Sequence, residues 1–298
     1  ADMQQQLGEP ILKLKQDVTR WNSTYDMLQR ALQVRNSLMT TLALNCPGIE
    51  KITMEDMSVM EQACELLRIF KDCTEEMCSE KHVTASKLIL LYSAIRKWCL
   101  KFQGRIEIDR NVQAMCSKLM EELDRRFKNI EENKLFAEAT ILDPRFKTRG
   151  FSQDRFAERA KQYLITHCAN YHGKLVPNTT STTPISETVQ KSTIWEDFDE
   201  AVSQLVQNPS PKAAAIVEVE TYLRDPLVPR TVNPLTWWSE KRTTYPALFT
   251  LAKVRLCAVA TSVPCERIFS KAGQVITERR NRLSGKRVSQ ILFLNYNL

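Results

Sequence analysis

The chain contains 298 residues, a length that allows one large domain or two ordinary ones with a hydrophobic core. Hydrophobic residues make up 43% and charged residues 26% of the sequence, which are ordinary values for a globular protein. Only seven glycines occur and no GxGxxG or Walker pattern is present, so the composition argues against glycine-rich phosphate loops and favours helices.

The formal net charge of +7 is concentrated near the C-terminal end of the chain. Residues 251–298 hold nine Lys or Arg and two acidic residues, so this segment alone accounts for the excess. Such localisation is typical of a protein that contacts nucleic acid or another polyanion. A solvated basic helix face gives the same pattern, and charge by itself leaves both interpretations open.

The first half of the chain predicts one strand followed by packed helices. Residues 10–21 alternate partially between apolar and polar side chains and predict the strand. A helix is predicted from Asn22 onward, and the break Cys46-Pro-Gly48 ends it. Three more helices are predicted from apolar stripes with a period of 3.6 residues. The stripes are Met57, Met60, Cys64, Leu67 and Phe70; Leu88, Leu91, Ile95, Trp98 and Phe102; and Val112, Cys116, Leu119, Leu123 and Phe127.

The second half predicts further helices separated by polar tracts. A helix over residues 135–142 is expected to stop at Asp143, because a residue before proline leaves the helical region. Other helices are predicted at 155–172, 194–206 and 214–223, with a disordered or loosely held loop at 173–193 and a linker at 207–213. Further helices begin at Asn233-Pro234 and at Pro246.

Cysteine and histidine usage does not indicate a disulfide framework or a metal site. Nine cysteines are scattered without a CxxC motif, mostly on apolar helix faces, which predicts buried free thiols in a reducing compartment. His167, Cys168 and His172 lie close in sequence but lack a paired Cys-x-x-Cys, so zinc is not predicted there. The chain begins at Ala1 without a signal sequence or a membrane-spanning run, and reads as a piece of a longer protein.

Glu266 is the candidate catalytic residue. It follows Pro264 in the first turn of a predicted helix, where a carboxylate commonly stabilises the positive end of the helix dipole. The functional interpretation is a metal-binding carboxylate, but two-metal phosphoryl chemistry needs several converging carboxylates. Both interpretations remain open at this point.

Trp237 and Trp238 are candidate interface residues. Adjacent residues on a helix point about 100° apart, so one indole can face the core while the other faces a partner. An arrangement with both indoles in the core fits the sequence equally well.

Several segments together resemble the hAT transposase superfamily. Residues 261–270, 272–273, 279–283 and 292–294, with the pattern Asn-Pro-Leu-x-Trp-Trp at 233–238 and Tyr245-Pro246, resemble its C-terminal dimerisation region. Residues 19–25 resemble the Arg-Trp motif of the superfamily, and residues 141–147 resemble another recurring segment. Cys265 departs from the usual serine. The likeness spans about residues 8–298 and is nearest to host-encoded zinc finger BED-domain proteins.

The resemblance implies a mainly α fold, with a helical insertion domain attached to a partial RNase H-like α/β core. Residues 1–25 would supply a late strand of that core. Residues 26–213 would form the insertion, with a flexible loop near 173–193. Residues 214–298 would form the helical dimerisation region, including the last core helix.

The resemblance also assigns site residues. Glu266 matches the catalytic glutamate, while the two catalytic aspartates would precede residue 1 and are not matched by Asp17 or Asp143. Trp21 matches a tryptophan near the DNA-cleavage site, although a packing role fits it equally. The residues expected to contact DNA are Arg20, Trp21, Arg267, Lys271, Arg279, Arg280 and Arg282. Those expected at a dimer interface are Trp237, Trp238, Ile268, Phe269, Ile291, Leu292, Phe293 and Leu294.

The leading hypothesis is the C-terminal part of a domesticated nuclear protein, linked to transcription regulation, that forms a homodimer and contacts the DNA backbone without reading its sequence. No cofactor, membrane or small-molecule substrate is expected for this chain. Zn²⁺ is expected only in a BED finger before residue 1, and Mg²⁺ or Mn²⁺ only if the full protein is catalytic. One alternative is part of an active transposase, and another is a helical protein-interaction scaffold.

Overall fold

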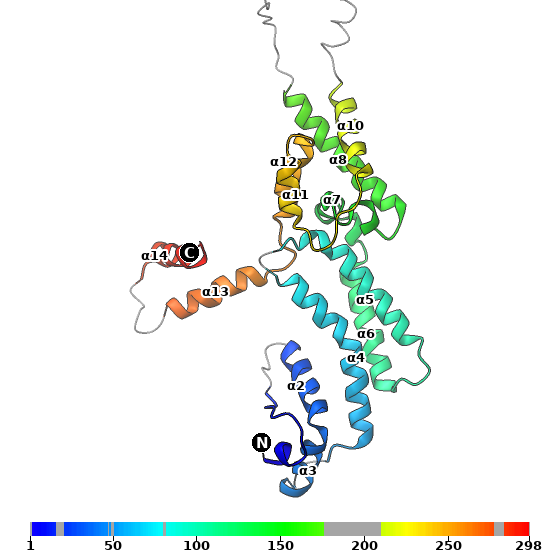
Figure 1. Cartoon of the computed structure of the whole chain (residues 1–298), viewed down its shortest axis with the longest axis vertical. Helices are drawn as coiled ribbons and strands as arrows, with labels where there is room; N and C mark the ends of the chain where they lie inside the picture. Colours follow the sequence, from blue (N-terminus) through cyan, green and yellow to red (C-terminus); the bar gives the residue numbers. More distant parts are fainter. Residues whose placement is uncertain are drawn as a thin grey trace, which may run out of the picture. The chain divides into compact units, whose positions relative to one another are not determined.

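The computed structural model describes residues 2–15, 21–46, 48, 51–79, 82–175, 210–276 and 283–297, and all regular secondary structure in these ranges is helical (Figure 1). The mainly α prediction is therefore confirmed. The helices are α1 (Asp2–Gln6), α2 (Trp21–Gln33), α3 (Arg35–Asn45), α4 (Met54–Met77), η1 (Ala85–Lys87), α5 (Leu88–Gln103), α6 (Arg110–Phe127), η2 (Ile130–Glu132), α7 (Lys134–Leu142), η3 (Lys147–Gly150), α8 (Asp154–Leu175), α10 (Pro211–Arg224), α11 (Pro234–Glu240), α12 (Pro246–Leu256), α13 (Val263–Val275) and α14 (Gly285–Asn297).

Helix starts follow the local chemistry of the sequence. The side chain of Asn133 accepts from the Leu135 amide at the start of α7 (3.0 Å), and Asn233 accepts from the Leu235 amide at the start of α11 (3.0 Å). α7 ends at Leu142, immediately before the Asp-Pro pair, as predicted. Proline occupies the first turn of α10, α11, α12 and α13, where its missing N–H costs no hydrogen bond.

The predicted strand is absent from the part of residues 10–21 that the structure describes. Residues 9–15 belong to no helix or strand, residues 16–20 lie outside the described ranges, and Trp21 begins α2. A strand needs a neighbouring strand for its backbone hydrogen bonds, and the described ranges contain none. A side chain takes one of these backbone groups instead, because Gln4 Nε2 donates to the Leu12 carbonyl (2.9 Å).

Other element boundaries differ from the predictions by a few residues. The helix predicted from Asn22 divides at Val34 into α2 and α3. The linker predicted at 207–213 is shorter at its C-terminal end, because α10 begins at Pro211. The loop predicted at 173–193 is helical as far as Leu175, and the rest of it lies outside the described residues together with the helix predicted at 194–206.

Packing divides the chain into two compact units. Unit 1 comprises residues 1–76 and 91–128, and unit 2 comprises residues 77–90 and 129–298. α8 packs against α10 within unit 2, so the middle of the chain and the start of its C-terminal region share one packing unit. The core of unit 1 joins α4, α5 and α6, with Leu66, Cys99, Phe102 and Cys116 fully buried. Members of the predicted stripes of α5 and α6 take part, but α4 contributes Leu66 and Cys73 rather than most of its predicted stripe.

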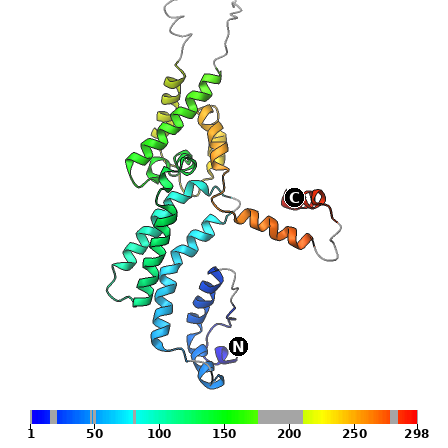
Figure 2. The ribbon, with the colours of Figure 1, turned by 180° about the vertical axis from the view of Figure 1, so that it is seen from behind.

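The core of unit 2 is built around α7. Every residue from Ala137 to Leu142 is buried, because α7 packs against α8, α12 and η1. The two opposite views show α7 lying within the group formed by α8, α10 and α12 (Figures 1 and 2). The C-terminal region therefore contributes directly to the core that the middle of the chain forms.

Gly150 is required by close packing at this core. A Cβ added to it would clash with Thr140 Cγ2, and Thr140 is itself buried and donates to the Ser86 carbonyl (3.1 Å). We predict that Gly150→Ala lowers the free energy of unfolding by about 1–3 kcal/mol, measured by urea denaturation. Gly173→Ala is the matched control, since nothing lies within 4 Å of the added carbon, and it is expected to leave stability unchanged or raised. Equal stability of both variants would contradict the packing argument.

Arg105 and Glu65 form the clearest ion pair of unit 1. The guanidinium makes two hydrogen bonds to the carboxylate (2.7 and 2.8 Å) and lies 4.9 Å from the Phe102 ring, and this bonding lowers the pKa of Glu65 below its usual value. Because the folded-state pKa is lowered, the stabilisation is present above about pH 5 and is lost as the pH falls through the folded pKa.

We therefore predict that Glu65→Gln costs about 0.5–1 kcal/mol of unfolding free energy at pH 7. The difference from the unsubstituted chain should shrink at acid pH, as measured by denaturation at both values. A cost that does not change between pH 7 and pH 3 would rule out the ion pair as its source.

Candidate functional site

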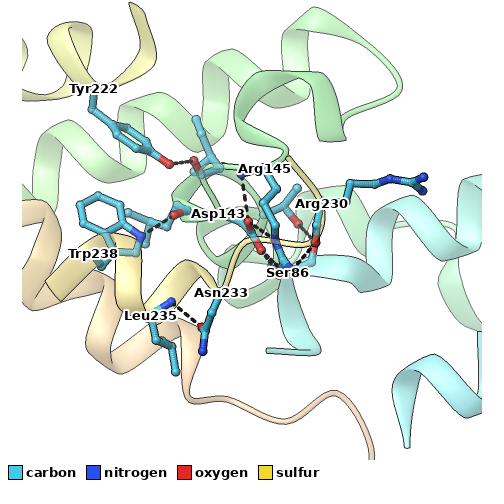
Figure 3. A network of polar contacts seen from close by, with 11 residues as sticks. Ser86, Asp143, Arg145, Tyr222, Arg230, Asn233, Leu235 and Trp238 are labelled. Carbon is cyan, nitrogen blue, oxygen red and sulfur yellow. Dashed lines mark hydrogen bonds and ion pairs between the residues drawn. The ribbon is translucent and has the colours of Figure 1, made fainter. Parts of the chain in front are cut away.

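The segment after α7, which carries the motif at residues 141–147, is centred on the buried carboxylate of Asp143. Ser86 Oγ donates to Oδ2 (2.6 Å), and the Arg145 guanidinium donates to both carboxylate oxygens (2.8 and 2.6 Å; Figure 3). The Arg145 backbone amide adds a further bond (3.1 Å). Since this carboxylate is fully paired inside the protein, its role is to fix the turn that follows α7.

Two aromatic side chains satisfy the carbonyls at the end of α7. Tyr222 Oη donates to the Ile141 carbonyl (3.0 Å), and Trp238 Nε1 donates to the Leu142 carbonyl (2.8 Å; Figure 3). The last carbonyls of a helix have no intrahelical partner and are costly to bury unpaired. The two rings also pack on each other, with centroids 5.1 Å apart. α10 and α11 thus supply the hydrogen-bond donors that pair the last carbonyls of α7.

Lys147 does the same for the end of α10. Its Nζ donates to the Tyr222 and Asp225 carbonyls (2.6 and 2.7 Å) and lies 4.5 Å from the Tyr222 ring. Burial lowers the pKa of Lys147 to about 8, and the charge of Asp225 opposes this shift. No local pattern predicts this role of Lys147, because it depends on carbonyls that lie 75 or more residues further along the chain.

Two buried glutamates hold α12 in unit 2. Glu138 on α7 pairs with Arg255 on α12, and its other oxygen lies 3.1 Å from His167 Nε2. Glu218 on α10 accepts from the Leu248 amide on α12 (2.9 Å), and its second oxygen lies 2.9 Å from His172 Nε2. His167 and His172 therefore each face a carboxylate of a neighbouring helix. Within the described ranges, no group of three or more His, Cys, Asp or Glu side chains is arranged to hold a metal ion.

Glu266 lies in the first turn of α13, as predicted, and is exposed. Its Oε1 accepts from Ser262 Oγ (2.7 Å), one turn earlier at the N-cap position. This geometry matches the helix-start interpretation of the sequence. Of the two aspartates considered beside it, Asp143 is paired in the interior with Arg145, and Asp17 lies outside the described residues.

The hairpin formed by α13 and α14 leaves most of its large apolar side chains exposed. α13 has no buried residue, and Val288 is the buried residue of α14. The two helices pack on each other, and Lys271 Nζ donates to Asn295 Oδ1 (3.3 Å). The side chains that remain exposed are Phe269 (75%), Ile276 (50%), Ile291 (40%), Phe293 (67%), Leu294 (54%) and Tyr296 (47%).

The eight expected interface residues are placed in three environments. Phe269, Ile291, Phe293 and Leu294 lie on the exposed surface of the hairpin, and Ile268 and Leu292 are half-buried on it. Trp237 is half-buried against the core of unit 2. Trp238 is 1% exposed within that core, because its N–H caps α7, so it offers a partner no surface.

The expected DNA-contacting residues are only partly within the described ranges. Arg267 and Lys271 are exposed on α13, and Trp21 is partly exposed as the first residue of α2. Arg20, Arg279, Arg280 and Arg282 lie outside the described residues. Among the helices that the structure describes, none combines the length and the hydropathy needed to span a bilayer.

Comparison with known proteins gives two family matches. Residues 218–298 match the hAT family C-terminal dimerisation region, and residues 1–66 match the ZBED1 RNase-like helical domain.

Three relatives match most or all of the chain. Zinc finger BED domain-containing protein 4 of Homo sapiens is 24% identical over the whole chain and 25% of its own length. Putative AC transposase of Zea mays is 24% identical over 92% of the chain and 35% of its own length. Putative transcriptional regulator tpeD of Talaromyces stipitatus is 24% identical over 96% of the chain and 32% of its own length.

The chain thus spans about a quarter to a third of the length of these relatives. The motifs at residues 141–147 and 233–238 lie in the core of unit 2, and the match to the dimerisation region covers α10 to α14 in whole or in part. The chain is therefore related to the hAT transposases and to the zinc finger BED domain-containing proteins, and its residues 218–298 match the hAT dimerisation region.

Proposed function

We propose that the chain forms a homodimer through the α13–α14 hairpin, and that the hairpin also contacts the backbone of DNA in the nucleus. The observation that carries the proposal is the exposure of six large apolar side chains in the α13–α14 hairpin, which lies within the match to the hAT dimerisation region. The names of two relatives, a transposase and a transcriptional regulator, support a role on DNA.

The energetics of the hairpin favour a second copy. A helix of 13 residues is marginal by itself, and the contact with α14 leaves every residue of α13 at least partly exposed, so burial against a second chain would stabilise it further. Each large apolar side chain that becomes buried contributes about 1.5–3 kcal/mol. Several such side chains suffice to offset the cost of association. A twofold axis would bring the same residues together from both chains, so each buried side chain would contribute its free energy twice per dimer.

The exposed apolar residues of α13 share one side of the helix. Cys265 and Phe269 are four residues apart, which places them on the same face, and the exposed Ile276 follows directly as the C-cap residue. Ile268, Ala272 and Val275 are half-buried in the hairpin. The exposed face is thus available to α13 or α14 of the partner while the hairpin contact is kept.

The same hairpin carries exposed cations. Arg267, Lys271, Lys286 and Arg287 are all exposed on α13 and α14. Such side chains bind phosphates and give an affinity that depends on salt but not on base sequence. Base-specific reading of DNA would then belong to another part of the full-length protein.

The transposase alternative rests on Glu266, which is exposed at the start of α13 but is paired with Ser262. In this chain we assign it to the helix start. A catalytic role in the full-length protein, with Mg²⁺ or Mn²⁺, would require further carboxylates to converge on it.

We predict that the chain sediments as a dimer at micromolar concentration. Phe269→Ser or Leu294→Ser should raise the dissociation constant of the dimer by about 100-fold or more, because each change removes two buried side chains per dimer. Analytical ultracentrifugation measures the dissociation constants. Val217→Ser, which replaces an exposed valine of α10, is the matched control and should leave the dimer intact. A monomeric unsubstituted chain, or an equal effect of the control, would refute the interface.

We also predict that the chain binds double-stranded DNA of arbitrary sequence with an affinity that falls steeply with salt. The double variant Lys286→Glu, Arg287→Glu should reduce the slope of log affinity against log salt by about 2 for each chain of the dimer that contacts the DNA, measured by fluorescence anisotropy. Ultracentrifugation of the variant checks that the dimer is retained. Lys101→Glu on α5 is the control for charge alone, since Lys101 is also exposed. No binding, or binding that ignores salt, would favour the scaffold alternative instead.

A further inference from the structure

The connection from α10 to α11 begins with Asp-Pro-Leu-Val-Pro-Arg at residues 225–230. We propose that this segment is a docking site for a proline-recognition domain that has an aromatic-lined groove and an acidic rim, as SH3 domains do. The proposal does not depend on dimerisation or on DNA binding, because none of its residues lies in the α13–α14 hairpin.

This segment starts in the polyproline II conformation that such grooves accept, and its residue types favour the same conformation further on. Asp225 has φ −54° and ψ 143°, close to the polyproline II values. Pro226 and Pro229 have φ fixed by their rings, and Val228 precedes a proline and is restricted to extended conformations. Residues 226–229 belong to no helix or strand. We therefore infer that the segment forms one turn of a polyproline II helix.

The three-residue repeat of this helix decides which edge faces outward. Asp225 and Val228 share one edge, and both are half-buried against unit 2. Tyr245 Oη donates to Asp225 Oδ2 (2.8 Å), and the Val228 amide donates to the Pro144 carbonyl (3.2 Å). Pro226 and Pro229 share the second edge and are both exposed. Leu227 lies on the third edge and is 48% exposed.

Two outward edges are what a proline-recognition groove requires, because it packs the prolines and the neighbouring apolar residue between aromatic rings. Arg230 adds the charged element. Its carbonyl accepts from Arg145 Nη1 (3.4 Å), which fixes the backbone, while its side chain points away from the network around Asp143 (Figure 3). A carboxylate on the rim of the groove is the complementary group for this guanidinium.

The segment is held in place at both ends, which lowers the entropy lost on binding. Lys147 Nζ bonds the Asp225 carbonyl (2.7 Å), and the Val232 amide bonds the Pro229 carbonyl (3.0 Å). Asn233 then begins α11. A preformed ligand of this kind spends little of its binding free energy on ordering.

The test is a titration of the intact chain with a panel of purified SH3 domains, with WW domains as a comparison. Binding is measured by biolayer interferometry. We expect at least one SH3 domain to bind, and Leu227→Ser and Arg230→Glu each to weaken that binding by about tenfold or more. These two positions are exposed, so the variants should fold, which circular dichroism and the thermal midpoint verify. Leu235→Ser, at an exposed leucine of α11, is the control and should leave binding unchanged.

Absence of binding across the SH3 panel would overturn the proposal. So would binding that is equally strong in the Leu227→Ser and Arg230→Glu variants. Binding by WW domains alone, with no effect of Arg230→Glu, would overturn the acidic-rim assignment and with it the SH3 class of partner.

Discussion

The structure of unit 2 depends on pairing the carbonyls at the buried end of α7. A helix that ends inside a protein leaves polar groups that are costly to bury unpaired, and here Tyr222 and Trp238 supply the donors. Both donors lie 80 or more residues further along the chain. Lys147, which follows α7, in turn donates hydrogen bonds to the carbonyls at the end of α10. Loss of any one donor would leave a buried acceptor unpaired, so the middle of the chain and its C-terminal region fold as one core.

This arrangement divides the hAT dimerisation region into two parts with different roles. Residues 218–256 are built into the core of unit 2, and the buried carboxylates of Glu138 and Glu218 fasten α12 there. The chain between α12 and α13 is also bonded to unit 2, because the Ala260 amide donates to Thr84 Oγ1 (3.1 Å). The α13–α14 hairpin is the part that keeps its apolar side chains exposed. The part of the region that packs into unit 2 and the proposed dimer interface thus lie on successive segments of the chain.

Local sequence rules predicted most of the helices, since apolar periodicity, the cap at Asn233 and the proline in the first turn at Pro246 act within a few residues. They failed where the outcome depends on distant groups. The alternation at residues 10–21 resembles a strand, but a strand requires a partner that local pattern does not supply. The placement of Trp238 in the core depends on the end of α7, and the burial of Lys147 depends on the end of α10. The apolar residues of the hairpin were identifiable because an apolar helix face without a local partner is already visible in the sequence.

Hydrogen exchange at two protein concentrations tests the central claim most directly. Amides in α13 and α14 should exchange slowly at tens of micromolar protein and much faster after dilution below the dissociation constant, because their protection comes from the second chain. Amides in α7, α10 and α12 should stay protected at both concentrations, because their protection comes from the core of unit 2. Fast exchange of the hairpin at every concentration, or protection of the hairpin that does not respond to dilution, would contradict the account.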